Sequence, residues 1–403
     1  MEITRLLINR WFAFFILSGM LFIPFSFQFY SIQQFLSESI FGGLVNYVAD
    51  LIGIEWRLND FSSDSKRLVI LAVLLLLFSL ILAFISRLKV LNKLQWHKTE
   101  NVIRLIASYY LGWVLLKYGL DKLFKCQFYL PEPNILYSRV GDLDKDILFW
   151  STMGSSYSYN IFMGISEIIP GIFLFFGKTR KLGLLLALGV LLNVVAINFS
   201  FDISVKLFSG FLLFIAFYLI GPFAVNLWRF LSNQKLVSTQ SSIDTFTKST
   251  KTFHWGNLVV VSIILIESMF VYVKNQNFND DKFDRSLFHG AYEVNQLIQG
   301  EDTLIGEKNS LKNIFYHRDS YLIFQFKNEE MVDYKMEIDP IKKTLTLFDD
   351  EQNKKIYSIE YNQLSKKMKL IHKGKYDLEI IHCTEKEWKK MPLIQPLFHW
   401  TVD

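Results

Sequence analysis

Cysteine is scarce in this chain, which contains two among its 403 residues, Cys126 and Cys383. Because the two lie far apart, no CxxC motif exists, and dithiol redox chemistry within one motif is excluded. The sequence also lacks a glycine-rich phosphate loop and a Gly-x-Ser-x-Gly motif. The familiar sequence signatures of phosphate-loop enzymes and serine hydrolases are therefore absent.

Histidine is absent from the long apolar runs, and charged residues are fewer than in a typical soluble domain. None of the seven histidines falls inside a long apolar run, which argues against haem ligation within a membrane. No His/Cys pair has the spacing of a metal site, so we predict none. Charged residues make up 20% of the chain, below the roughly 25% of soluble domains. Most apolar runs lie in residues 1–275, whereas residues 276–403 are rich in charged and polar residues. This change of composition predicts a domain boundary near residue 276.

Long apolar runs dominate the first part of the chain. A membrane-spanning helix needs about 20 mostly apolar residues, and several stretches meet that requirement. The hydropathy criterion predicts seven spans, at residues 11–30, 68–88, 102–123, 159–177, 182–200, 203–228 and 256–273. No small-residue cleavage site follows the first run, so we interpret it as a retained span. The chain is thus predicted to be a polytopic helical membrane bundle.

Lysine and arginine alternate with acidic residues from loop to loop. Basic residues mark the N-terminus and the loops near residues 87–98, 178–181 and 229–251, whereas the intervening loops are mixed or acidic. Because Lys and Arg favour the cytoplasmic side, we expect a cytoplasmic N-terminus and an extracytoplasmic C-terminal domain. We expect a multi-pass protein of a bacterial cytoplasmic membrane. We therefore attribute the net charge of +5 to basic residues in the cytoplasmic loops, and we do not interpret it as a sign of nucleic-acid binding.

Two segments between the spans have patterns of their own. Residues 35–52 place apolar side chains at three- and four-residue steps, which predicts an amphipathic helix in the outer membrane interface. Residues 232–255 are largely polar, and we expect a flexible cytoplasmic linker there.

From residue 276 onward the pattern changes to a period of two. Segments such as KNIFYHR, YLIFQF, VDYKMEI, TLTLF, KIYSIEY, KMKLIH and YDLEIIHC alternate or run apolar, separated by turn residues. Seven or eight short strands at this spacing predict an antiparallel meander, closed as a small barrel or packed as a sandwich.

Polar residues inside the predicted spans are the best candidates for a functional site, because an ionisable side chain near the bilayer centre costs about 2.5–3.5 kcal/mol. Glu167 is predicted to lie roughly 12 Å deep in the fourth span. The candidate ligand-binding residues are Tyr118, Asp121, Lys122, Glu167, Asn193, Asn198, Asp202 and Lys206. If their helices face one another, these residues line a polar pocket that opens outward.

Structural roles are open for the same residues. Asp202 could cap the helix that follows it, with Lys206 as its i, i+4 partner. Asn193 and Asn198 could form hydrogen bonds between helices. Glu267, nearer the end of the seventh span, could extend to the interface. Cys126 and Cys383 could form a disulfide on the outer side, or remain two free thiols.

The segments YYLGWVLLKYGLDKLFKCQF, GSSYSYNIFMGISEIIPGIFLFFGKTRKLGLLL and NVVAINFSFDISVKLFS resemble the DoxX family of bacterial membrane proteins. The resemblance implies a four-helix core at residues 101–231, preceded by two spans within 1–100. The linker 232–255, the seventh span at 256–275 and the β domain at 276–403 extend beyond that core. Members of the family are similar to a membrane subunit of a quinone-linked oxidoreductase, and some act in oxidative-stress complexes.

These observations lead to one main functional hypothesis and two alternatives. The bundle is expected to bind a small amphiphile, a quinone or a lipid, and to support redox or envelope-stress chemistry with a membrane or periplasmic partner. Glu167 would carry a proton or anchor a hydrogen bond, while Lys122 and Lys206 would meet an oxygen of the ligand. The alternatives are a membrane scaffold whose β domain docks an envelope partner, and a transporter of a small solute.

Overall fold

The computed structural model describes residues 2–54, 61–87, 96–234, 251–286, 288–300, 302–305, 311–349, 352–374, 378–396 and 400–401. Much of the predicted linker, and most of the loop between the second and third predicted spans, lie outside these ranges. Two compact units are present. The helical unit comprises residues 1–127 and 158–278, and the barrel unit comprises residues 128–157 and 279–403.

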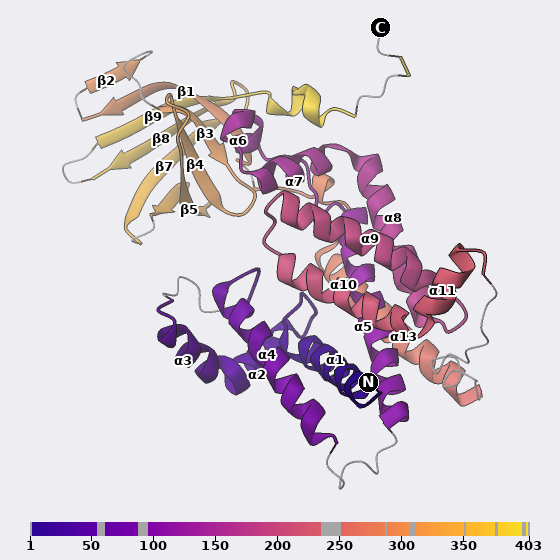
Figure 1. Cartoon of the computed structure of the whole chain (residues 1–403). Coiled ribbons are helices and arrows are strands. Elements are labelled where there is room, and N and C mark those ends of the chain that lie inside the picture. The colour runs from indigo at the N-terminus through magenta and orange to yellow at the C-terminus, as the bar shows by residue number, and fades with distance from the viewer. Residues whose placement is uncertain are drawn as a thin grey trace. The chain divides into compact units, whose positions relative to one another are not determined.

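The described part of the helical unit is built from helices of 8 to 28 residues (Figure 1). They are α1 (Glu2–Phe22), α2 (Tyr30–Ser37), α3 (Gly43–Leu51), α4 (Lys66–Ile85), α5 (Trp96–Leu123), α8 (Tyr157–Phe175), α9 (Arg180–Ser200), α10 (Lys206–Ile220), α11 (Ala224–Leu231) and α13 (Lys251–Asn275). Helix α5 packs against α1, α10 and α13 and is largely buried, so it is the central helix of this unit.

Five helices in the described part of the chain are long and apolar enough to cross a membrane. They are Lys66–Ile85, Tyr157–Phe175, Arg180–Ser200, Lys206–Arg229 and Trp255–Lys282. This criterion therefore supports five membrane-spanning helices, and the prediction of seven is not confirmed. Helix α1 contributes the apolar stretch Leu6–Phe22, and it ends there because Pro24 disfavours helix at the residue before it. Helix α5 carries several charged residues, which lowers its hydropathy.

Contacts near both ends of neighbouring helices determine their directions. They show that α5 runs parallel to α1 and α13 and antiparallel to α8, and that α4 runs antiparallel to α1. The contacts are Tyr109 with Asn257, Asp121 with Tyr272, Gly112 with Gly171, Gly119 with Gly164, Arg10 with Trp96, Phe27 with Trp113, Arg10 with Ser86, and Glu38 with Arg67. Helices next to each other in sequence thus reverse direction where these contacts define it.

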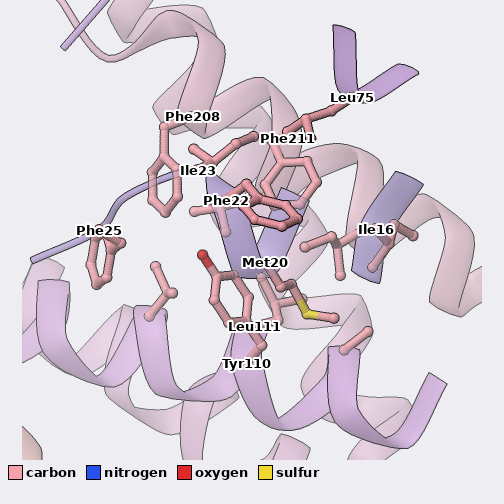
Figure 2. Close-up of a cluster of buried hydrophobic side chains, with 14 of the residues drawn as sticks. Ile16, Met20, Phe22, Ile23, Phe25, Leu75, Tyr110, Leu111, Phe208 and Phe211 are labelled. Atoms are coloured by element: carbon pink, nitrogen blue, oxygen red, sulfur yellow. The ribbon is translucent and has the colours of Figure 1, made fainter. Parts of the chain in front are cut away.

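The chain after α1 folds back into the helical unit as an aromatic segment. The Phe25 ring stacks on Phe208 at 4.9 Å between centroids, and the Phe27 ring lies 4.2 Å from Trp113. Figure 2 shows Phe22, Phe25 and Phe208 near Tyr110, whose hydroxyl points into this apolar cluster. These contacts fix residues 23–29 against α5, where the prediction had continued the first span to residue 30.

The predicted amphipathic helix is present, over Tyr30–Leu51, with a π-helical turn at Glu38–Gly42 between α2 and α3. Its buried face includes Gln33 and Ser37, whose side chains donate to the carbonyls of Met20 and Phe22 at the end of α1. Its exposed side carries large apolar residues, namely Ile32, Phe35, Ile40, Leu44, Tyr47 and Leu51. The interfacial location of this helix stays a prediction.

The second part of the chain forms an antiparallel barrel, which settles the choice between barrel and sandwich (Figure 1). The strands are β1 (Gly290–Gln299), β2 (Asp302–Ile305), β3 (Leu311–Tyr316), β4 (Tyr321–Phe326), β5 (Met331–Asp339), β6 (Thr344–Phe348), β7 (Lys354–Asn362), β8 (Lys367–Lys373) and β9 (Leu378–Glu385). Consecutive strands from β3 to β9 pair in a meander, and β1 closes the barrel by pairing with both β3 and β9. Strand β2 forms a hairpin with the second half of β1.

Large side chains fill the barrel. Tyr316, Tyr357, Leu345 and Leu370 are essentially inaccessible to solvent, and their positions follow the period-two pattern of the sequence. Cys383 belongs to the same core. No disulfide is present among the described residues, and a pairing of Cys126 with Cys383 stays a prediction.

Residues 128–157 pack with the barrel, although the prediction assigned them to the four-helix core. The Glu132 carboxylate lies 2.7 Å from His289 Nε2, and the backbone N–H of Leu130 donates to Asp281. Burial alone would raise the pKa of Glu132, but the hydrogen bond with His289 and the nearby side chains of His289, His317 and Arg318 hold it below its usual range. These contacts attach the segment, including α6 (Pro133–Leu136) and α7 (Lys145–Ser155), to the barrel.

Candidate functional site

Two glycine pairs bring α5 and α8 into backbone contact. A Cβ atom at Gly119 would lie 2.7 Å from the carbonyl oxygen of Gly164, and one at Gly112 would lie 2.8 Å from that of Gly171. The pairs are spaced seven residues apart on both helices, so they lie on one face of each. Small residues permit this close approach of helices in membranes. Because the two helices run antiparallel, the chain beyond Gly119 and the chain beyond Gly164 continue in opposite directions from their contact.

A buried ion pair joins the two helices at this crossing. Lys122 Nζ is 2.8 Å from Glu167 Oε2, and both side chains are more than nine-tenths buried. Each residue follows its crossing glycine by three positions, which is nearly one helical turn. Because the helices are antiparallel, the two residues lie on opposite sides of the Gly119–Gly164 contact, and their ion pair joins the helices across it.

Further polar contacts join α5 to α13. The hydroxyl of Tyr272 donates to Asp121 Oδ1 at 2.5 Å. One and a half turns away, Glu267 accepts from three donors. Its Oε1 accepts from Lys117 Nζ at 3.3 Å and from the backbone N–H of Gln28 at 2.9 Å, and its Oε2 accepts from the indole N–H of Trp113 at 2.6 Å. Glu267 thus connects α13, α5 and the aromatic segment after α1.

An open groove of about 820 Å³ lies between α5 and α13 on the side of their N-terminal halves. Its lining is almost wholly apolar or aromatic and consists of Leu105, Ile106, Tyr109, Tyr110, Trp113, Gly256, Asn257, Val260, Ile263 and Ile264. The Tyr109 hydroxyl donates to the Phe175 carbonyl and is also hydrogen-bonded to Asn257. The groove ends at Trp113, whose indole N–H is bound to Glu267.

Four of the eight predicted site residues meet around α5. Lys122 and Glu167 form the buried pair, and Asp121 is bound by Tyr272. Tyr118 is half-buried, and its ring lies 5.3 Å from the Phe25 ring and 5.3 Å from the Lys122 ammonium.

The other four predicted residues belong to the hairpin of α9 and α10. Asn198 is buried and donates to Ser209 Oγ at 2.9 Å, which is a contact between the two helices, while Asn193 is exposed. Lys206 lies 2.7 Å from Asp202, whose side chain is 82% exposed.

Asp202 does not cap α10, because the side chain of Asp64 takes that role. The Asp64 carboxylate accepts from the backbone N–H groups of Lys206 and Leu207, at 2.9 and 3.0 Å. Such bonds satisfy helix donors that otherwise lack a partner. The sequence could not indicate this cap, since Asp64 precedes Lys206 by 142 residues.

Sequence reasoning missed Trp113, Lys117 and the groove. Lys117 falls in the third predicted span and follows Trp113 by four positions, so both lie on one helix face. This spacing and the glycines repeated every seven residues were readable signals. The pairing of Lys117 with Glu267 was not readable, because it joins helices 150 residues apart.

Comparison with known proteins gives one relative and no family. The chain is 30% identical over 104 residues to YwoB of Bacillus subtilis (strain 168), which is described as uncharacterized. The matched stretch is 26% of this chain and 66% of YwoB, so it covers just under two thirds of that protein. No family model matches the chain, and no solved structure matches it.

Proposed function

We propose that the helical unit binds a membrane amphiphile, a quinone or a lipid, in the groove between α5 and α13. The observation that carries this proposal is the groove itself. Its volume of about 820 Å³ falls within the roughly 300–1,000 Å³ of small-molecule sites, and its few polar groups lie among apolar and aromatic side chains. Because the groove is open between two helices, a ligand could enter from the surrounding lipid.

The proposal places seven helices across a bacterial cytoplasmic membrane, with the N-terminus inside and the barrel unit outside. Five apolar helices support membrane insertion. Helix α5 crosses as the central helix because its charges face protein partners, as at Lys117 and Lys122. The alternating directions of the helices support an odd number of crossings. The DoxX-like redox role, and a membrane or periplasmic partner for it, belong to the same proposal.

Filling the groove tests the proposal. Gly256 lines the groove, and a Cβ atom there meets no atom within 4 Å, so Gly256→Phe should fill the space without distorting α13. The protein is purified, extracted with organic solvent, and the extract is analysed by mass spectrometry. We expect a stoichiometric quinone or lipid from the wild type and a loss of at least about tenfold from the variant.

Gly189→Phe is the matched control. Gly189 lies in α9, is exposed, and also has open space around its Cβ position. This variant should retain the bound molecule at the wild-type level. Wild-type protein that yields no such molecule, or a Gly256→Phe variant that retains it fully, contradicts the proposal.

A further inference from the structure

We infer that the amphiphile in the groove has an uncharged head group with a hydroxyl, and that this hydroxyl binds between Lys117 and Glu267. The inference rests on the proposed function, because it names the chemical class of ligand for the same groove. It excludes two other kinds of head group, an anionic phosphate and a neutral group that can only accept hydrogen bonds.

The position of the two residues connects them to the groove. Trp113, Ile263 and Ile264 line its end. Lys117 follows Trp113 by four residues on α5, and Glu267 follows Ile263 by four residues on α13. Each charged residue is therefore one helical turn, about 6 Å, beyond the lining on the same helix face. An amphiphile whose chain occupies the groove thus brings its head group to this pair.

The charges of the pair balance each other. Lys117 Nζ and Glu267 Oε1 are 3.3 Å apart, and their side chains are 8% and 12% exposed. A buried charge without a partner is strongly unfavourable, whereas a balanced pair is tolerated. A charged head group would add an unbalanced charge to this enclosed place. An uncharged head group leaves the balance unchanged.

The hydrogen-bonding capacity of Lys117 and Glu267 matches a hydroxyl group. An ammonium has three donors, and within the described part of the chain Lys117 donates one hydrogen bond, to Glu267 Oε1. Each carboxylate oxygen can accept two bonds. Oε1 accepts from Lys117 and Gln28, whereas Oε2 accepts from Trp113. A hydroxyl can accept from Lys117 and donate to Oε2, so it satisfies both residues with one oxygen atom.

Native mass spectrometry of the full chain can test the head-group class with three matched probes. The probes are dioleoylglycerol, its methyl ether and dioleoyl phosphatidic acid, which share their chains and differ in the head group. We expect the wild type to bind the hydroxyl probe about tenfold more tightly than the ether, since hydrogen bonds to charged groups are strong. Phosphatidic acid should bind more weakly than the ether.

Charge-changing variants make the test sharper. Glu267→Gln leaves the Lys117 charge unbalanced, so phosphatidic acid should become the best of the three probes. Lys117→Met leaves the opposite charge and should weaken phosphatidic acid further. The double variant restores neutrality and should remove the preference for the hydroxyl over the ether. Size-exclusion profiles verify that each variant is folded.

The outcomes separate this inference from the proposed function. Equal binding of the three probes to the wild type, all lost in Gly256→Phe, retains the groove and overturns the head-group class. Tightest binding of phosphatidic acid to the wild type overturns it in the same way. Binding that Gly256→Phe does not change, or no binding of any probe, overturns both.

Discussion

Lys122 and Glu167 expose 8% and 6% of their side chains, and their charged atoms are 2.8 Å apart. Removing one charge of such a buried pair strands the other, which typically costs about 3–5 kcal/mol. Replacing both with apolar residues of similar size removes the stranded charge and is often close to neutral. Losing one residue of the pair should therefore destabilise the protein strongly, whereas replacing both should change its stability little.

We expect Lys122→Met and Glu167→Met each to lower the thermal midpoint of the detergent-solubilised protein markedly, and the double variant to recover most of the loss. Lys206→Met is the matched control, because its nearer partner Asp202 is 82% exposed and screened by solvent, and its contact with Asp64 is longer, at 3.8 Å. Its midpoint should stay near that of the wild type. Additive losses in the double variant contradict a coupled pair.

At the scale of elements, the crossing of α5 and α8 depends on the lack of side chains at its contact points. Gly119→Ala and Gly164→Ala each add a methyl group 2.7 Å from a backbone oxygen, so the helices must separate. Overpacking of this kind costs about 1–3 kcal/mol. We expect both variants to lower the thermal midpoint.

Gly189→Ala should have the opposite effect, since its Cβ atom meets open space and alanine favours the helix by about 1 kcal/mol. Circular dichroism during heating measures all three variants. If Gly119→Ala and Gly189→Ala shift the thermal midpoint in the same direction, the stability of the helical unit does not depend on the close contact of α5 and α8.

How far the sequence predicts these elements depends on the range of the interactions. The predicted strand YLIFQF coincides with β4, because alternation and turn residues are local signals. Closure of the barrel by β1 and β9 joins residues about 90 positions apart, and no local pattern encodes it. The same limit applies to the site. Polar residues in α5 were recognised, but the partners of Asp121 and Lys117 on α13 follow from packing alone.

For the whole molecule, the proposed topology can be measured with an impermeant maleimide. Leu364, in the turn after β7, is 99% exposed, and Lys178, between α8 and α9, is also exposed. Single cysteines at these positions are introduced into a Cys126→Ser background. Cys383 can stay, because it is 2% exposed and burial raises the pKa of its thiol to about 12, so the reactive thiolate is scarce at neutral pH.

In intact cells we expect Leu364→Cys to react with the maleimide, because the barrel unit is proposed to lie outside. Lys178→Cys should react only after the membrane is permeabilised, since the basic turn after α8 is proposed to be cytoplasmic. The odd number of crossings before the barrel requires these two results together. Labelling of both positions in intact cells would contradict the order of crossings, and the reverse pattern would invert the orientation while leaving the helix directions intact.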